Sequence, residues 1–331
     1  MFPLPLKIAG IGRYLPSRVV PSAELEARCG LTPGWIERKT GVRERRWASG
    51  DETNSFMGAQ AAREAVAAAG LALTDVDLIV NASGSQEQAI PDGGPLIQRQ
   101  LGLETSGVGC LSVHATCLSF IAAVDVAASF LATGRAHRVL VVSADIGSAG
   151  INFAEPESAS LIGDAAAALV LTRPAEGEPS RLLAARLETY SAGADLTCIR
   201  GGGTRRHPNH AETRPEDNLF HMEGPAVYRM AHQHLGGFLD RVRPGLAHGL
   251  GAIALVVPHQ ASLFAVRSLR KYGMPDDRVM LNVDRLGNCI ATSIPSALYD
   301  AVQQGRVRRG DEILLLGTGA GLSLGAAILT Y

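Results

Sequence analysis

The chain has 331 residues, 46% of them hydrophobic, and a formal net charge of −1, which is the composition of a folded globular protein. Its 31 lysines and arginines are scattered along the chain, which argues against a nucleic-acid-binding protein. Its five cysteines are odd in number and widely spaced, which fits neither a disulfide framework nor a metal-binding CxxC motif. Because the N-terminus lacks an export signal and the apolar runs stop short of the roughly 18 residues that span a bilayer, we expect a cytoplasmic protein without a membrane span.

Short apolar runs alternate with longer alanine-rich stretches of helical period, which predicts an α/β fold built on a largely parallel sheet. In the first half of the chain, helices are predicted over residues 52–70 and 117–134, each ended by a glycine. Buried strands are predicted over 77–82 and 138–144.

The second half repeats this alternation, which suggests two similar halves. The polar segment 172–180 contains proline and glycine and is typical of a link, so we place the halves at 1–175 and 176–331. Residues 200–217 are expected to form a long surface loop. The elements predicted in this half are strands over 252–258, 279–284, 312–316 and 324–330, and helices over 261–272 and 290–305.

Three polar side chains stand where predicted elements meet. Cys117 opens a predicted helix, His259 directly follows a strand, and Asn288 precedes a helix. Free N–H groups at a helix N-terminus favour a cysteine thiolate, which makes Cys117 a candidate nucleophile. In a shared cleft, a histidine can exchange protons and an asparagine amide can donate hydrogen bonds.

Each of these side chains also has a structural explanation when it is taken alone. A free cysteine is most often a small buried hydrophobe, and a histidine or asparagine in such a turn often caps a helix. Their occurrence at equivalent junctions favours one common site. The glycine-rich segment 317–325 lacks the spacing of a nucleotide-binding loop, but its small residues allow backbone N–H groups to approach a ligand carbonyl.

Four segments in this order, HATCLSF, VPHQAS, GNCIATSIP and GTGAGLSLG, resemble the ketoacyl-acyl-carrier-protein synthase III family of the thiolase superfamily. WIERKTGVRER, IGDAAAALVL and HMEGPAVYRMA extend the resemblance over nearly the whole chain. The resemblance implies a five-layered αβαβα fold of two duplicated halves and a homodimer. It also implies a transferase of fatty-acid or polyketide type that acts on thioesters of coenzyme A or acyl carrier protein, without a metal or a redox cofactor.

The same resemblance supplies roles for individual residues. Cys117 would take up the acyl group, and the backbone N–H groups of Cys117 and Ala320 would form the oxyanion hole. His259 and Asn288 would stabilise the enolate that forms when a malonyl thioester loses CO₂.

Several positions depart from the pattern of housekeeping members of this family. Trp35 matches a tryptophan that stacks on the adenine of coenzyme A, but Pro156 stands where its arginine partner is expected. Ser262 and Phe264 replace an asparagine and an arginine after the histidine motif, and that arginine would help to dock the carrier. Arg267, Arg270 or Lys271 could take over carrier recognition.

Two further positions are predicted to contact substrate. Ile90 stands where some relatives place an aromatic residue that limits the acyl pocket across the dimer, and Arg205 lies in a loop that could meet a phosphate. A plain solvated loop is the more ordinary explanation for Arg205. Together these departures predict a specialised member with a pathway-specific acyl group, of the kind used in secondary metabolism.

Three alternatives remain open from the sequence. The Cys117-bound acyl group could pass to a hydroxyl or an amine, with His259 as general base. The enzyme could instead join two β-ketoacyl thioesters. A noncatalytic partner subunit that only binds acyl chains is the third possibility, and the joint presence of Cys117, His259 and Asn288 argues against it.

Overall fold

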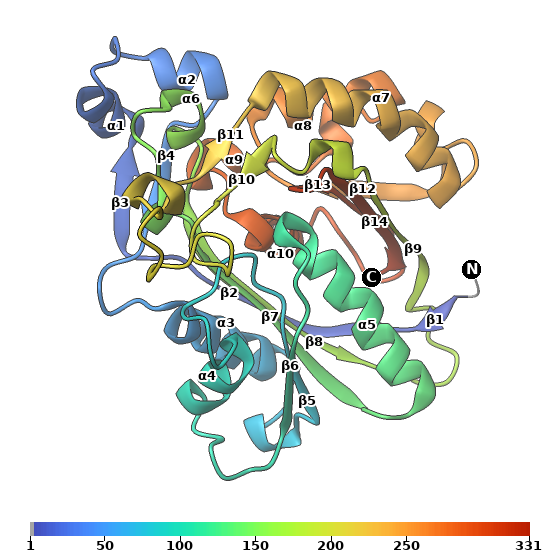
Figure 1. The fold of residues 1–331 in the computed structure, drawn as a ribbon. Helices are drawn as coiled ribbons and strands as arrows, with labels where there is room; N and C mark the ends of the chain where they lie inside the picture. Colours follow the sequence, from blue (N-terminus) through green and yellow to red (C-terminus); the bar gives the residue numbers. More distant parts are fainter. Residues whose placement is uncertain (1–2) are drawn as a thin grey trace.

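The computed structural model describes residues 3–331 and contains two five-stranded sheets with helices between them and on both outer faces (Figure 1). This is the predicted five-layered α/β thiolase arrangement. Each sheet is mixed, with antiparallel as well as parallel neighbours, so the prediction of a largely parallel sheet is wrong. The reason is visible at residues 320–322, where a turn too short for a crossover joins two strands and forces them to run antiparallel.

The first sheet has the order β2-β8-β7-β5-β6. Its parallel pairs are β5 with β6 and β5 with β7, whereas β8 runs antiparallel to both of its neighbours. The strands are β2 (Lys7–Tyr14), β5 (Leu78–Asn81), β6 (Gly109–Ser112), β7 (Arg138–Ile146) and β8 (Asp164–Thr172).

The second sheet has the order β1-β9-β14-β13-β12, and only β12 and β13 run parallel. Its first strand comes from the very start of the described chain, so the N-terminus reaches across to the sheet of the second half. The boundary predicted after residue 175 falls in the connection between β8 and β9. The strands are β1 (Leu4–Pro5), β9 (Arg181–Thr189), β12 (Ile253–Pro258), β13 (Glu312–Gly319) and β14 (Ser323–Thr330).

Helices α5 (Ser119–Thr133) and α10 (Ser293–Gln303) lie between the two sheets and share one apolar core with them. Helices α3 (Asn54–Ala68) and α4 (Gly93–Gln100) cover the outer face of the first sheet, and α7 (Gly224–Val242) covers that of the second. The alanine-rich α3 packs very closely on β2, because Gly10 and Gly12 on β2 have no side chain. A side chain at either position would collide with backbone carbonyls of α3.

Residues Thr116–Thr133 form a helical stretch that is long and apolar enough to cross a membrane, contrary to the expectation that the apolar runs stop short of that length. However, 56% of this stretch is buried inside the protein. Its apolar side chains fill the core between the two sheets, which accounts for its composition.

The remaining elements surround this framework. A small two-stranded sheet joins β3 (Arg18–Pro21) to β4 (Glu44–Trp47), and another joins β10 (Thr197–Cys198) to β11 (His221–Met222). The other α-helices are α1 (Ser22–Cys29), α2 (Trp35–Thr40), α6 (Pro156–Ala159), α8 (Leu263–Arg267) and α9 (Val283–Leu286). The short 3₁₀ helices are η1 (Leu73–Asp75), η2 (Thr116–Leu118), η3 (Ser148–Gly150), η4 (Ser191–Gly193), η5 (Pro215–Asn218), η6 (Leu246–His248), η7 (Ser268–Tyr272), η8 (Asp276–Arg278) and η9 (Ile290–Thr292).

The strand predicted over 279–284 is wrong. Val279 makes only an isolated bridge to Val256 at the edge of the second sheet, and the chain then turns into α9. The turn is held by the side chain of Gln260, whose Oε1 accepts the backbone N–H groups of Asn282 and Val283. The backbone N–H groups of this segment thus bind a buried side chain instead of a neighbouring strand, which the apolar sequence had suggested.

Candidate active site

Cys117 lies in the 3₁₀ turn η2 between strand β6 and helix α5, two residues before α5 begins. The preceding residue, Thr116, has a φ of 50°, in the left-handed region that non-glycine residues seldom adopt. Ser119 holds this turn, because its Oγ donates to the carbonyl of Thr116 and accepts the N–H of Ala115. The strained turn gives Cys117 a fixed place next to the second sheet.

Two backbone N–H groups, those of Ala320 and of Cys117 itself, face the Cys117 sulfur, where each lowers the pKa of the thiol. Ala320 follows β13 at the start of the turn that leads into β14. The two residues named for the oxyanion hole are therefore brought together at the nucleophile, although they are 203 positions apart in the numbering (320 minus 117).

Burial raises the pKa of the Cys117 thiol to about 12, and the negative charge of Asp145 raises it further. The two N–H groups act in the opposite direction but do not outweigh burial. The side chain keeps partial solvent access. In the free protein Cys117 is thus a neutral thiol at pH 7, and the prediction that its position favours the thiolate is wrong, because burial raises the pKa by more than the nearby N–H groups lower it.

His259 directly follows β12, and its N–H donates to the carbonyl of Leu316 on β13 at 2.8 Å. The residue is only 7% exposed, and its Nδ1 has no hydrogen-bond partner among residues 3–331. Burial lowers the pKa of His259 to about 4, so the imidazole is neutral at pH 7. An unpartnered buried nitrogen is costly, which points to a bound partner during the reaction.

The segments that carry Cys117 and His259 meet at Gly317 on β13. A side-chain carbon placed at Gly317 would lie 3.0 Å from the Cβ of His259 and 3.0 Å from a methyl group of Leu118. The absence of a side chain at this position lets the imidazole segment and the cysteine turn pack against the same strand.

The prediction placed Asn288 between a strand and a helix. In the structure it follows helix α9 instead and forms an isolated bridge with Ile162. Its backbone is held on both sides, because its N–H donates to Leu161 and its carbonyl accepts the N–H of Gly163. Its side-chain Oδ1 accepts the N–H of Ile290 at 2.9 Å. The Nδ2 end of the amide is therefore the end available to a ligand.

Asp145 is a functional candidate that the sequence analysis missed. It is the penultimate residue of the mostly apolar strand β7, and it is fully buried near Cys117. Burial raises its pKa, whereas hydrogen bonds from Ser85 and Thr292 favour its ionised form. A lone carboxylate at the carboxyl end of a buried strand was the signal that could have identified it.

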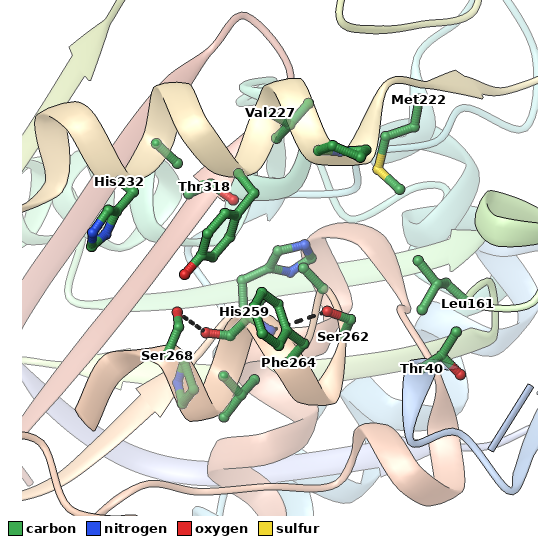
Figure 2. A pocket seen from close by; sticks show the side chains of 18 of the residues that line it. Thr40, Leu161, Met222, Val227, His232, His259, Ser262, Phe264, Ser268 and Thr318 are labelled. Atoms are coloured by element: carbon green, nitrogen blue, oxygen red, sulfur yellow. Dashed lines mark hydrogen bonds between the residues drawn. The ribbon is translucent and has the colours of Figure 1, made fainter. Parts of the chain in front are cut away.

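A cavity of about 550 Å³ opens above His259, between helices α7 and α8 and next to α2. Figure 2 shows the imidazole of His259 between the helix that carries Val227 and His232 and the helix that carries Phe264. Apolar and aromatic side chains make up most of the wall, which suits the long arm of a thioester substrate. The lining includes Trp35, Lys39, Glu157, Met222, Tyr228, Arg229, Leu235, His259, Ser262, Phe264, Gly317 and Thr318.

The structure therefore places three of the predicted substrate-binding residues, Trp35, Ser262 and Phe264, at this cavity. The lining of the cavity does not include Cys117, Ala320 or Asn288. Of the candidate catalytic residues, only His259 lines the cavity, with Gly317 beside it.

Ile90 and Arg205 do not line the cavity either. Ile90 is 88% exposed, and Arg205 lies exposed on the loop between β10 and β11. Within one chain the geometry thus gives Arg205 no contact with this site, and the role of Ile90 across a dimer stays a prediction. Among residues 3–331, no cluster of three or more histidine, cysteine, aspartate or glutamate side chains is arranged to hold a metal ion.

Comparison with known proteins agrees with this architecture. Residues 111–191 match the family profile described as 3-oxoacyl-[acyl-carrier-protein] synthase III, and residues 248–331 match the profile of its C-terminal part. The β-ketoacyl-[acyl-carrier-protein] synthase III of Aquifex aeolicus is 33% identical over 98% of this chain and 99% of its own length.

Solved structures give the same result. The crystal structure of the Aquifex aeolicus enzyme superposes with a TM-score of 0.87, covering 98% of this chain and 100% of its own. That of the Pseudomonas aeruginosa enzyme also has a TM-score of 0.87, at 30% identity, and covers 99% and 98% of the two chains. The fold and these matches define an acyltransferase-type condensing enzyme of the thiolase superfamily. Within that superfamily, the chain belongs to the 3-oxoacyl-[acyl-carrier-protein] synthase III family.

Proposed function

We propose that this enzyme loads an acyl group from an acyl thioester onto Cys117 and condenses it with a malonyl or β-ketoacyl thioester. The observation that carries the proposal is the pair of N–H groups from Cys117 and Ala320 at one buried sulfur, next to the strand that also holds His259. Two N–H donors beside a nucleophile are the kind of arrangement that stabilises a tetrahedral oxyanion.

In the first step, the sulfur of Cys117 attacks the carbonyl carbon of the donor thioester. The bond between that carbon and the donor sulfur breaks, and the Cys117 proton leaves with the departing thiol. Because Cys117 and His259 are both neutral at pH 7, the imidazole is free to accept this proton and return it to the leaving group. Each oxyanion donor contributes about 3 kcal/mol to such a step.

In the second step, the malonyl carboxylate leaves as CO₂, and the electrons of the broken carbon–carbon bond form an enolate. N–H donors from His259 and the Nδ2 of Asn288 would bind the enolate oxygen. The enolate carbon then attacks the acyl carbonyl, and Cys117 departs as a thiolate that regains a proton. The orientation of Asn288, whose Oδ1 is already occupied by Ile290, supports a donor role for its Nδ2.

We assign the cavity above His259 to the pantetheine arm of coenzyme A or of an acyl carrier protein. Its apolar wall suits the arm, and Lys39 and Arg229 supply positive charge for a phosphate. Of the basic residues considered for carrier docking, Arg270 is engaged by Asp276, and Lys271 lies 3.2 Å from the hydroxyl of Tyr228. Arg267 is therefore the best candidate of the three. We further propose a cytoplasmic homodimer that needs no metal or redox cofactor.

The proposal is tested by separating the two half-reactions. Incubation with panels of acyl-CoA and acyl-carrier donors, followed by intact-protein mass measurement, should show an acyl adduct that is absent in Cys117→Ala. Asn288→Ala should keep this adduct while CO₂ release from a malonyl carrier falls about a hundredfold, because its amide acts only in the second step. Equal loss of both steps would contradict the assigned roles.

Transfer of the acyl group to a hydroxyl or amine is the second candidate, and the neutral imidazole of His259 favours it because it could act as a general base. The same experiment separates the two. Product formation without CO₂ release from a malonyl thioester would favour simple transfer, and the absence of an adduct with every donor would favour a binding subunit.

A further inference from the structure

Asp145 is a fully buried carboxylate with five hydrogen-bond donors, all of them from two segments that are distant in sequence. Oδ1 accepts the backbone N–H groups of Gly84 and Ser85 and the hydroxyl of Ser85, at 2.7 to 3.0 Å. Oδ2 accepts the backbone N–H and the hydroxyl of Thr292, both at 2.9 Å. Such charge-assisted bonds in a dry interior hold their partners firmly.

Gly84, the first of these partners, packs against both halves of the site. A side-chain carbon placed at Gly84 would lie 2.5 Å from the Cγ2 of Ile290 and 3.0 Å from the carbonyl oxygen of Thr116, the residue before Cys117. Through this glycine, Asp145 fixes a turn that touches the cysteine segment on one side and the Asn288 segment on the other.

Thr292, which comes from the second of the two segments, lies in the short helix η9 together with Ile290. Ile290 has a φ of 51°, which is rare for a β-branched residue and requires support from its surroundings. Its side chain packs where Gly84 and Gly147 have none. Its N–H is the group that binds the Oδ1 of Asn288.

These contacts close a ring from Asp145 through Gly84 to Ile290, along the chain to Thr292, and back to Asp145. We propose that Asp145 is a positioning residue for the condensation step: through Thr292 it holds Ile290, and through Ile290 it holds the amide of Asn288 with Nδ2 toward the substrate. The inference rests on the proposed function. It adds a carboxylate that touches no substrate but determines which end of the Asn288 amide is presented.

Thr292→Val tests this inference, because it removes the hydroxyl donor to Oδ2 but keeps the side-chain shape, the backbone N–H and the whole Gly84 turn. We expect CO₂ release from a malonyl carrier to fall about tenfold while acyl loading of Cys117 changes less than about threefold, since only the amide orientation is disturbed. Thr292→Ser restores the hydroxyl and should recover CO₂ release. Gly84→Ala, whose new methyl group would meet both Ile290 and Thr116, should impair both steps.

Three results would overturn the inference alone: an unchanged ratio of the two steps in Thr292→Val, equal behaviour of the Val and Ser variants, or loss of Cys117 loading in Thr292→Val. The last result would mean that Thr292 supports the fold or both steps rather than the amide. A wild-type enzyme that loads Cys117 but releases CO₂ from no malonyl thioester would overturn the proposed function as well.

Discussion

Buried, neutral His259 should make the protein less stable in mild acid. Its pKa is about 4 in the folded protein, compared with the ordinary value of 6.5 in the unfolded chain. Between these values the unfolded chain binds a proton that the folded protein does not, so the free energy of unfolding decreases as the pH falls from 6.5 towards 4. A difference of 2.5 pH units (6.5 minus 4) corresponds to about 3 kcal/mol, a large share of a typical stability.

Urea denaturation at pH 7 and at pH 4 measures this effect in wild type and in His259→Gln, whose amide does not titrate. The loss of stability between the two pH values should be about 3 kcal/mol smaller in the variant. His232→Gln is the matched control, because it removes a histidine from the same cavity but at an exposed position. An identical loss in wild type and His259→Gln would refute the assignment of a buried, neutral imidazole.

Three further outcomes follow from the site. Because the pKa of Cys117 is about 12 rather than 9.0, its alkylation by iodoacetamide at pH 7 should be about a thousandfold slower than that of an ordinary thiol. The alkylation rate should rise about tenfold per pH unit. A rate that reaches a plateau below about pH 9, after subtraction of the Cys117→Ala signal, would contradict this. Gly317→Ala should lower the free energy of unfolding by about 1–3 kcal/mol and slow condensation, because its methyl group would lie 3.0 Å from the Cβ of His259. Gly203→Ala is the control, because its methyl group would have no atom within 4 Å, and it should change neither quantity in the same denaturation and turnover assays. Trp35→Ala should raise the KM for acyl-thioester loading with little change in the maximal rate, and an unchanged KM would count against the cavity as the thioester channel.

Most elements near the site could be predicted from local sequence. The strand before His259, the helix after Cys117 and the alanine-rich helix α3 are all present, with ends shifted by a few residues. Errors arose where side chains from elsewhere decide the backbone path. Gln260 turns the chain after Val279 away from a strand, and the packing of Ile290 against Gly84 sets the conformation beside Asn288.

Local sequence patterns were sufficient to identify the α/β class, the family and the candidate site residues, because hydrophobic period, glycine turns and short motifs are properties of neighbouring residues. The ionisation states of the site residues could be derived only from the folded chain. Cys117 is a thiol because burial and the charge of Asp145 raise its pKa, and His259 is a neutral base because burial lowers its pKa. The groups responsible come from segments far away in the chain. Desolvation depends on every atom that surrounds a group, and no local pattern records those atoms.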